Sequence, residues 1–361
     1  MRFSFTSPLI RYTGRVAFPE DGAHFYWPGS FALMRFRGTR LACEVTCNVC
    51  WGTNALGLLV DGRLSKIPVE AAQNGQCQTL LLAENLEPGA EHEVMLFKRL
   101  DCSYSYVLHG GETDGELLPP PPRPALRLEF YGDSVTAGAC VECVDYVGRT
   151  DPCSNASAYD NAWWSYAWQC SRLLGAECHL TAQGGIAVLD GTGYFHYPDG
   201  IGMEQTWDRL CYFPEAGPYT PWDFSRFVPH AIVFALGQND QHDAATDTNC
   251  LSAADPAWRA RWKERYKDIV RGAAGHAPAG TPLVFITTLI RHDRAWDDAI
   301  GEMAAELRAE GLNARQYLFA RNGDGTNGHP RIPEQREMAE ELAAFLRTVL
   351  PLPADTPQAS R

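Results

Sequence analysis

The sequence has no long apolar run and no cluster of lysine and arginine. No stretch approaches the roughly 18 apolar residues that a membrane-spanning helix needs. The net charge is −13, which argues against nucleic acid and against an anionic membrane surface as partners. Neither an apolar stretch nor a small-residue cleavage site follows Met1, so no export signal is visible and we expect a cytoplasmic rather than a secreted protein.

The chain also has no strong compositional bias. Its 361 residues are 45% hydrophobic and 21% charged, which are the values of a folded globular protein. This length is enough for roughly two domains, each with its own core. The acidic balance is compatible with neutral substrates such as sugars.

The sequence pattern changes along the chain and predicts two domains of different class. Residues 1–118 contain short alternating apolar runs separated by turn signals, which predicts an all-β sandwich or jelly roll. Residues 119–124 are prolines and one arginine, a stiff linker that cannot join a sheet interior. Residues 125–352 form the second predicted domain, and residues 353–361 are expected to be a disordered tail.

The second predicted domain alternates strand and helix patterns. Strands are expected at 126–131, 177–181, 231–236, 283–289 and 317–320. Helices are expected at 162–174, 258–273, 297–310 and 333–349. This alternation predicts an α/β fold in which a parallel sheet is sandwiched by helices.

The chain contains twelve cysteines. Because no export signal is visible, we expect them to be reduced and buried. Cys47 and Cys50 have the spacing of a zinc knuckle, and so have Cys140 and Cys143. The two pairs lie in different predicted domains and lack the glycines that flank such knuckles, so we predict no metal site. We also predict that the protein needs no cofactor.

The most informative stretch is residues 126–138. Its first half predicts a buried strand, which ends at Gly132 and is followed by Asp133 and Ser134. Ligands of open parallel sheets bind beyond the carboxyl ends of the strands, so Ser134 is a candidate site residue. A serine in this place also suits a helix N-cap, which is the structural alternative.

Four short motifs, in this order, resemble the blocks of the SGNH (GDSL) hydrolases. They are Gly132-Asp133-Ser134, Gln183-Gly184-Gly185, Gly237-Gln238-Asn239-Asp240 and His329-Pro330. The resemblance implies an SGNH-hydrolase-like sheet with Ser134 as the nucleophile and His329 as the general base. It also implies an oxyanion hole built from the Ser134 and Gly185 backbone N–H groups and the Asn239 amide, with Gly184 as the alternative to Gly185. His242 is the second candidate for the base.

The sequence that precedes Ser134 resembles a narrower group, carbohydrate esterase family 2. The segments that carry this resemblance are Gly14-Arg15-Val16, Trp27-Pro28-Gly29-Ser30, Leu96-Phe97-Lys98-Arg99, and Leu117-Leu118 with the prolines after it. Members of that family join an N-terminal jelly roll to an SGNH domain and remove acetyl groups from sugars of plant polysaccharides. The resemblance therefore implies an acetyl xylan esterase-like serine esterase, which deacetylates carbohydrates by a Ser–His mechanism through an acyl-enzyme. It does not fix the substrate.

The sequence departs from both families at the partner of the histidine. SGNH enzymes commonly carry an aspartate three residues before the histidine, and the esterase family often carries it two before, where this chain has Thr326 and Asn327. Neither side chain bears the negative charge that stabilises an imidazolium. Three options are open for orienting His329: a backbone carbonyl or the Asn327 amide, Asp324, or a carboxylate from elsewhere. We favour the first, a Ser–His dyad, because the family resemblance admits members without the aspartate and any acceptor for the ring N–H selects the tautomer.

Tryptophans are frequent after the linker, and their flat aromatic faces suit sugar rings. Trp207 and Trp222 lie in a long segment rich in glycine, tyrosine and proline, so we expect them to form a wall of the substrate site. Two other functions stay open at this point. One is an SGNH esterase, lipase or thioesterase that acts on non-sugar acyl esters, and the other is a non-catalytic carbohydrate-binding protein.

Overall fold

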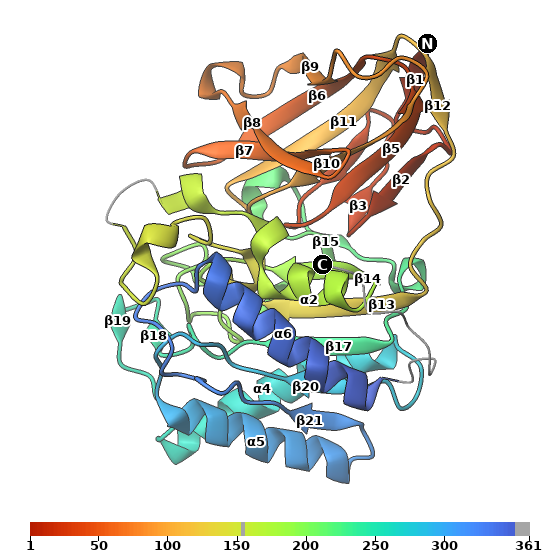
Figure 1. Cartoon of the computed structure of the whole chain (residues 1–361). Helices are drawn as coiled ribbons and strands as arrows, with labels where there is room; N and C mark the ends of the chain where they lie inside the picture. The colour runs from red at the N-terminus through yellow and green to blue at the C-terminus, as the bar shows by residue number, and fades with distance from the viewer. Residues whose placement is uncertain (153–155, 351–361) are drawn as a thin grey trace. The chain divides into compact units, whose positions relative to one another are not determined.

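The computed structural model describes residues 1–152 and 156–350 of the chain (Figure 1). The chain divides into two compact units. The first holds Met1–Arg123 together with Leu210–Thr220, and the second holds Pro124–Arg209 together with the chain from Pro221 onward. The tail predicted at 353–361 lies outside the described residues. None of the helices in the described ranges is long and apolar enough to cross a membrane.

The first unit is a sandwich of two antiparallel sheets, as the turn-punctuated pattern predicts. One sheet has the strand order β3-β4-β11-β6-β9 with β1 paired to β11, and the other has the order β12-β5-β10-β7-β8 with β2 paired to β5. The apolar faces of both sheets contribute to one buried core. The strands are β1 (Arg2–Ser4), β2 (Ile10–Thr13), β3 (Val16–Ala17), β4 (Ala23–Phe25), β5 (Phe31–Arg37), β6 (Leu41–Val49), β7 (Asn54–Val60), β8 (Arg63–Val69), β9 (Cys77–Ala83), β10 (Glu91–Lys98), β11 (Tyr104–Thr113) and β12 (Glu116–Leu118).

The hairpin between β7 and β8 illustrates how local sequence sets the register of this unit. Val60 pairs with Arg63, which leaves Asp61 and Gly62 as a two-residue turn. Both residues have a positive φ, 48° and 80°, as a type I′ turn requires, and Asp-Gly is a dipeptide that adopts this turn readily.

The second unit is built on a five-stranded parallel sheet with the order β14-β13-β17-β20-β21. These strands are β13 (Leu126–Gly132), β14 (Ala176–Ala182), β17 (Ala231–Ala235), β20 (Leu283–Phe285) and β21 (Ala314–Gln316). Numbered along the chain, the order is the 2-1-3-4-5 arrangement of flavodoxin-like sheets. In such sheets the ligand binds at the switch point between the first and third strands, which here are β13 and β17.

The helices of the chain are mostly in the second unit. They are α1 (Ser134–Ala137), α2 (Tyr166–Leu173), α3 (Met203–Thr206), α4 (Pro256–Gly275), α5 (Arg294–Ala309) and α6 (Ile332–Val349). Short 3-10 helices occur at Ala71–Gln73, Val144–Tyr146, Ala156–Tyr159, Ala162–Trp164, Pro214–Ala216 and Phe224–Arg226. Two further pairs of short strands are β15 (Arg209–Cys211) with β16 (Thr220–Pro221), and β18 (His242–Asp243) with β19 (Thr248–Asn249).

Helices cover both faces of the parallel sheet (Figure 1). Phe130 of β13 contacts Tyr166 of α2, with 6.2 Å between the ring centroids. The next residue, Tyr131, stacks on Phe234 of β17, which in turn contacts Tyr266 of α4. Because neighbouring residues of a strand point to opposite faces, α2 and α4 lie on opposite faces. In addition, α6 packs against α2, and α5 packs against α4 and β21.

Several predicted elements have different bounds in the structure, and the strand expected at 283–289, for example, is Leu283–Phe285. The helix expected from residue 162 begins at Tyr166, because the Ser165 hydroxyl caps it by accepting the Trp168 N–H at 3.3 Å. The strand expected at 317–320 lies earlier, at Ala314–Gln316. The apolar pattern that suggested the later strand has another use, since Tyr317 stacks on Phe345 of α6 with 4.6 Å between the ring centroids.

Candidate active site

Ser134 lies at the switch point of the sheet, directly after β13. Asp133 is the N-cap of α1, and its carboxylate accepts the Val135 N–H at 3.0 Å. Ser134 is the first residue of α1, and 9% of it is exposed. The capping role that the sequence allowed for the serine therefore belongs to Asp133, which leaves the Ser134 hydroxyl free for another contact.

His329 brings its imidazole to Ser134 from near the other end of the chain. Its Nε2 lies 2.8 Å from the Ser134 Oγ. Gln335 of α6 holds the histidine segment against α1 and α2. Its amide nitrogen donates to the Val135 carbonyl at 3.2 Å, and its amide oxygen accepts the Tyr166 N–H at 2.7 Å. The serine and the histidine that the sequence singled out therefore lie within hydrogen-bond distance of each other.

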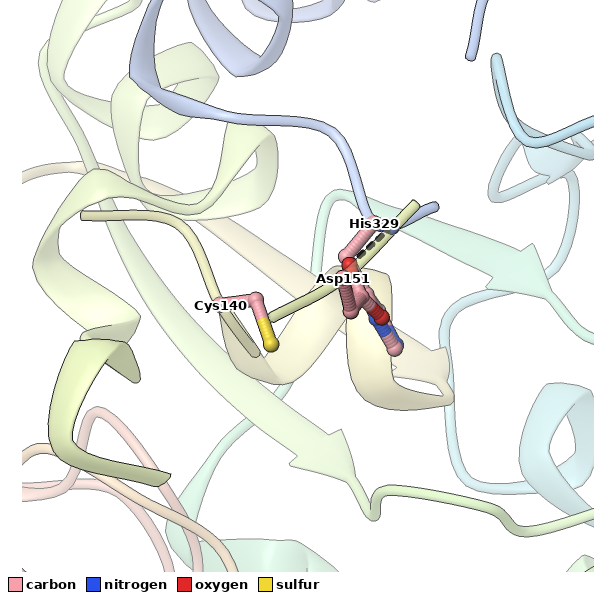
Figure 2. A group of neighbouring side chains, drawn as sticks. All are labelled: Cys140, Asp151 and His329. Carbon is pink, nitrogen blue, oxygen red and sulfur yellow. Dashed lines mark hydrogen bonds and ion pairs between the residues drawn. The ribbon is translucent and has the colours of Figure 1, made fainter. Parts of the chain in front are cut away.

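Asp151 contacts the other side of the His329 ring (Figure 2). Its Oδ2 lies 2.6 Å from the ring Nδ1, and its Oδ1 accepts the His329 backbone N–H at 3.0 Å. The segment that holds Asp151 and the segment that holds His329 approach closely at Gly328. A Cβ atom at this position would lie 2.7 Å from both the Asp151 carboxylate and the Arg149 carbonyl. A side chain at position 328 would push the carboxylate away from the ring.

The guanidinium of Arg331 fixes the Asp151 carboxylate. Arg331 is 0% exposed, donates to Asp151 Oδ1 at 2.7 Å and donates to the His329 carbonyl at 2.5 Å. Its own backbone N–H donates to the Glu334 carboxylate at 2.9 Å, in a capping box at the start of α6. Because the donors of Arg331 and of the histidine backbone both reach Oδ1, Oδ2 is left to face the ring.

The charges around the ring determine where its proton lies. Burial alone would lower the pKa of His329, but the contact with the Asp151 carboxylate outweighs burial and raises the pKa above its ordinary value. Burial alone would raise the pKa of Asp151, but the hydrogen bonds from His329 and Arg331 hold it well below its usual range. Asp151 is therefore ionised, Nδ1 of the neutral ring carries the proton, and Nε2 accepts from the Ser134 hydroxyl.

The loops that follow β14 and β17 flank the serine. Gly132, at the end of β13, pairs with Ala182 of β14 on one side and with Ala235 of β17 on the other. The residues predicted for the oxyanion hole, Gly184, Gly185 and Asn239, come directly after these two strand ends. The parallel register therefore brings both loops to the edge of the sheet that carries Ser134.

Donors for an oxyanion are available in these loops. The Asn239 amide nitrogen donates one N–H to the Ile186 carbonyl at 2.9 Å, and a primary amide carries a second N–H. Within the described ranges, no hydrogen-bond partner is found for the backbone N–H of Ser134 or of Gly185. The carbonyl of Gly184 accepts from the Gln183 amide at 2.9 Å.

Buried carboxylates connect the loops around the serine. Asp133 Oδ2 accepts from the Gln238 amide at 2.7 Å. Asp240 Oδ1 accepts from the Val188 N–H at 2.8 Å and from the Trp262 indole N–H at 2.7 Å. Burial raises the pKa of Asp133 to about 6 and that of Asp240 to about 7. These contacts give both aspartates a role in holding the loops rather than in facing a substrate.

The partners expected for His329 lie elsewhere in the structure. Asn327 and Asp324 line a surface pocket with Gly148 and Arg291, and the Asp324 carboxylate pairs with Arg294 at 3.1 Å. The ring nitrogen that they were expected to orient faces Asp151 instead. The contacts of the His329 ring therefore differ from the Ser–His dyad that we favoured. They match the third option considered for orienting this ring, a carboxylate from elsewhere in the chain. Sequence reasoning missed Asp151 because it lies 178 residues before the histidine, in no motif.

The tryptophans expected to form a substrate wall are packed against other side chains. Trp222 is 6% exposed, and the Arg226 guanidinium lies 4.7 Å from the centre of its ring. Trp207 covers Gly272 of α4, where a Cβ atom would lie 2.6 Å from the indole. This packing differs from the exposed wall that we expected, and it leaves little of the Trp222 ring for a sugar.

An exposed aromatic residue, Tyr194, contacts Gly185 through its backbone. Tyr194 is 46% exposed, and its backbone N–H donates to the Gly185 carbonyl at 2.7 Å. Its ring stacks on His242 with 4.0 Å between centroids, and its hydroxyl donates to Asn249 at 2.9 Å. Tyr194 is therefore held rigidly with one face toward solvent.

His242, the second candidate for the base, is 3% exposed and contacts the Gly193 carbonyl and Asp247.

One group of side chains in the site has the composition of a metal site. A sulfur of Cys140, a carboxylate oxygen of Asp151 and a ring nitrogen of His329 all lie within 4.8 Å of one another (Figure 2). Cys140 belongs to one of the cysteine pairs that the sequence offers as zinc knuckles, but its neighbours in this group are an aspartate and a histidine rather than other cysteines.

The first unit matches a known family model. The model described as carbohydrate esterase 2 N-terminal matches residues 12–122. The chain resembles carbohydrate esterase family 2. This finding confirms the resemblance that the motifs before Ser134 suggested.

Two known proteins are similar to nearly the whole chain. The cellulase/esterase CelE of Acetivibrio thermocellus is 26% identical over 355 residues, which are 95% of this chain. The chain spans only 40% of the length of that relative. The acetylxylan esterase / glucomannan deacetylase of Cellvibrio japonicus is 24% identical and matches 96% of this chain and 90% of its own. Both names are those of esterases, in line with the predicted class of carboxylic ester hydrolase.

A solved structure shows the same fold. The family two carbohydrate esterase from Clostridium thermocellum, in complex with cellohexaose, is 24% identical and has a TM-score of 0.76. The match covers 94% of this chain and 98% of that chain. An SGNH-type parallel sheet preceded by a β-sandwich is therefore the fold of this protein, as the motifs predicted.

Proposed function

We propose that this protein is a serine esterase that removes O-acetyl groups from carbohydrates, with its catalytic site in the second unit. The observation that carries the proposal is the 2.8 Å contact between Ser134 Oγ and His329 Nε2, in a ring held on its other side by an ionised Asp151. A nucleophile, a base and an orienting carboxylate in line are the parts that acyl transfer requires.

In the proposed reaction the Ser134 Oγ attacks the acetyl carbonyl while Nε2 of His329 takes the hydroxyl proton. Asp151 stabilises the imidazolium that forms. The backbone N–H groups of Ser134 and Gly185 and the second amide N–H of Asn239 bind the oxyanion. The sugar oxygen leaves with the proton from Nε2, and the acetyl group stays on Ser134. Water then attacks this ester by the same steps, which releases acetate and restores the serine.

A series of p-nitrophenyl esters, from acetate to octanoate, tests the reaction class. Acetate should be the preferred ester, and the enzyme should release acetate from acetylated xylo- or gluco-oligosaccharides in the same samples. Preference for long acyl chains would indicate an esterase or lipase of non-sugar substrates. Turnover that does not depend on Ser134, or no turnover beside tight oligosaccharide binding, would favour a carbohydrate-binding protein.

Asn239→Ala removes one proposed oxyanion donor. We expect kcat for p-nitrophenyl acetate to fall by roughly a hundred- to thousandfold, the usual cost of one such donor, with little change in KM. Asn249→Ala, on the nearby β19, is the matched control because it removes an amide of the same size that contacts the Tyr194 hydroxyl and is not a proposed oxyanion donor. A loss of about twofold in Asn239→Ala, within the range of a neutral surface change, would remove the amide from the hole.

Tyr194→Ala tests the sugar side of the site. The tyrosine contacts Gly185 through its backbone and presents a rigid aromatic face to solvent, and stacking on a sugar ring adds binding that a small phenyl acetate does not use. We expect KM for an acetylated oligosaccharide to rise about tenfold, which corresponds to about 1.4 kcal/mol and lies within the roughly 0.5–1.5 kcal/mol of a stacked aromatic contact. The kinetic constants for p-nitrophenyl acetate should stay near those of the parent. Equal losses on both substrates would indicate a structural role for Tyr194.

A further inference from the structure

We propose that Cys140, Asp151 and His329 form a binding site for a thiophilic divalent cation, such as Zn²⁺ or Cd²⁺, and that occupation of this site stops the esterase. The binding itself follows from the geometry of the three side chains. The inhibition rests on the function proposed above, so the two parts are tested by separate measurements.

The three ligand atoms converge from separate segments of the second unit (Figure 2). Cys140 follows α1, Asp151 follows the 3-10 helix Val144–Tyr146, and His329 precedes α6. Zinc bonds of about 2.0–2.3 Å in a tetrahedron place ligand atoms roughly 3.3–3.8 Å apart. The present separations, all within 4.8 Å, reach that range through small side-chain shifts. Thiolate, imidazole and carboxylate are together the ligands that zinc prefers, with water in the fourth position.

The electrostatics of the site favour a cation. Burial lowers the pKa of His329, and the carboxylates of Asp151, Asp160 and Asp133 act against burial and raise it. Asp160 also accepts the Cys140 backbone N–H at 2.6 Å, so it lies against the cysteine. A neighbouring cation, Arg331, binds Oδ1 of Asp151 and leaves Oδ2 toward the ring. Cys140 is 3% exposed and is not in a disulfide.

Occupation of the site would remove the base. A cation on Nδ1 of His329 uses the lone pair of that nitrogen, so the single proton of the neutral ring must move to Nε2. Nε2 then donates to the Ser134 hydroxyl and cannot take its proton. Asp151, as a metal ligand, no longer faces an N–H. One proton is released in this step, from the Cys140 thiol, because the thiolate is the form that binds metal.

The inhibition test uses the full chain after treatment with a chelator. Micromolar Zn²⁺ or Cd²⁺ should suppress hydrolysis of p-nitrophenyl acetate, and excess chelator should restore it. Mg²⁺ and Ca²⁺, which prefer oxygen ligands, should have no effect. In Cys140→Ala, measured relative to its own metal-free rate, the inhibition constant should rise at least about tenfold, as befits the loss of a ligand. Cys143→Ala, from the same turn, should keep the sensitivity of the parent.

A direct binding test does not depend on activity. Cd²⁺ added to the parent should produce the ultraviolet charge-transfer band of a cadmium thiolate, with one equivalent of this band missing in Cys140→Ala and present in Cys143→Ala. A protein without esterase activity that still shows this difference would retain the metal site and lose the proposed function. Equal bands in parent and Cys140→Ala, or equal inhibition of both, would overturn the metal site.

Discussion

Replacing Ser134 by alanine should lower kcat by about a millionfold, and adding His329→Ala to it should cost almost nothing more. Residues that act as one unit show this non-additivity, because removing either member already eliminates the proton-coupled attack. The residual rate, about 10³–10⁴ over water, would come from the oxyanion donors and from substrate binding. The measurement is p-nitrophenyl acetate hydrolysis by the two single variants and the double variant, with far-ultraviolet circular dichroism as the check on folding.

The expected coupling follows from the 2.8 Å contact between the Ser134 oxygen and the His329 ring. If the two losses multiplied instead, the serine and the histidine would act in separate steps, and the proposed transfer of a proton between them would be wrong. Ser225→Ala is a suitable control, since this hydroxyl in the same unit donates to Asp223 on the surface.

The site residues that follow a strand could be predicted from the sequence, because their order along the chain is enough to place them at the edge of the sheet. Ser134 follows β13 and Asn239 follows β17, and the parallel pairing of these strands fixes both at one edge. Their motifs are short and contiguous, so each could be recognised in the sequence alone. His329 was readable for the same reason, since it immediately precedes a strongly patterned helix.

The contact between Asp151 and His329 could not be predicted from the sequence, because it depends on how the two loops meet in space. It lies between two 3-10 segments, Val144–Tyr146 and Ala156–Tyr159, with no periodicity or motif around it. What marks it in the structure is the buried Arg331 that binds its Oδ1 and the close approach at Gly328. Arg331 and Gly328 are both visible in the sequence, but their shared target becomes apparent only when the two loops meet.

The prediction that Trp207 and Trp222 form a wall of the substrate site differs from the structure for a similar reason. A tryptophan in a long irregular segment can face a substrate or complete a core, and composition does not separate the two. Here Trp207 covers Gly272 of α4 and Trp222 is buried. Tyr194, which is 46% exposed, contacts Gly185 through its backbone N–H instead.

Asp151→Asn should lower kcat by about a thousand- to ten-thousandfold, the effect of the same change in a Ser-His-Asp triad. The amide keeps the size of the side chain and leaves an oxygen for the buried Arg331, so the fold should survive. It has no charge to stabilise the imidazolium, and its N–H₂ group opposes the Nδ1–H of His329. KM should change little, because the charge matters in the transition state.

The pH profile separates this role from a structural one. The base works when Nε2 is unprotonated, so kcat/KM should rise with pH through the pKa of His329. In the parent this pKa lies above the ordinary 6.5, because the Asp151 contact outweighs burial. In Asp151→Asn that contact is lost, so the rise should move to lower pH. A lower rate with an unmoved profile would make Asp151 a structural residue only.

Asn327→Asp is the matched variant for this prediction, because it puts a carboxylate where related esterases often carry one. With Asp151 already on Nδ1, we expect Asn327→Asp to retain activity in the parent. In Asp151→Asn it should recover part of the lost rate if a carboxylate at 327 can reach the ring. Normal activity of Asp151→Asn on its own, with normal pH dependence, would instead return the site to a Ser134–His329 dyad in which the charge of Asp151 serves only Arg331.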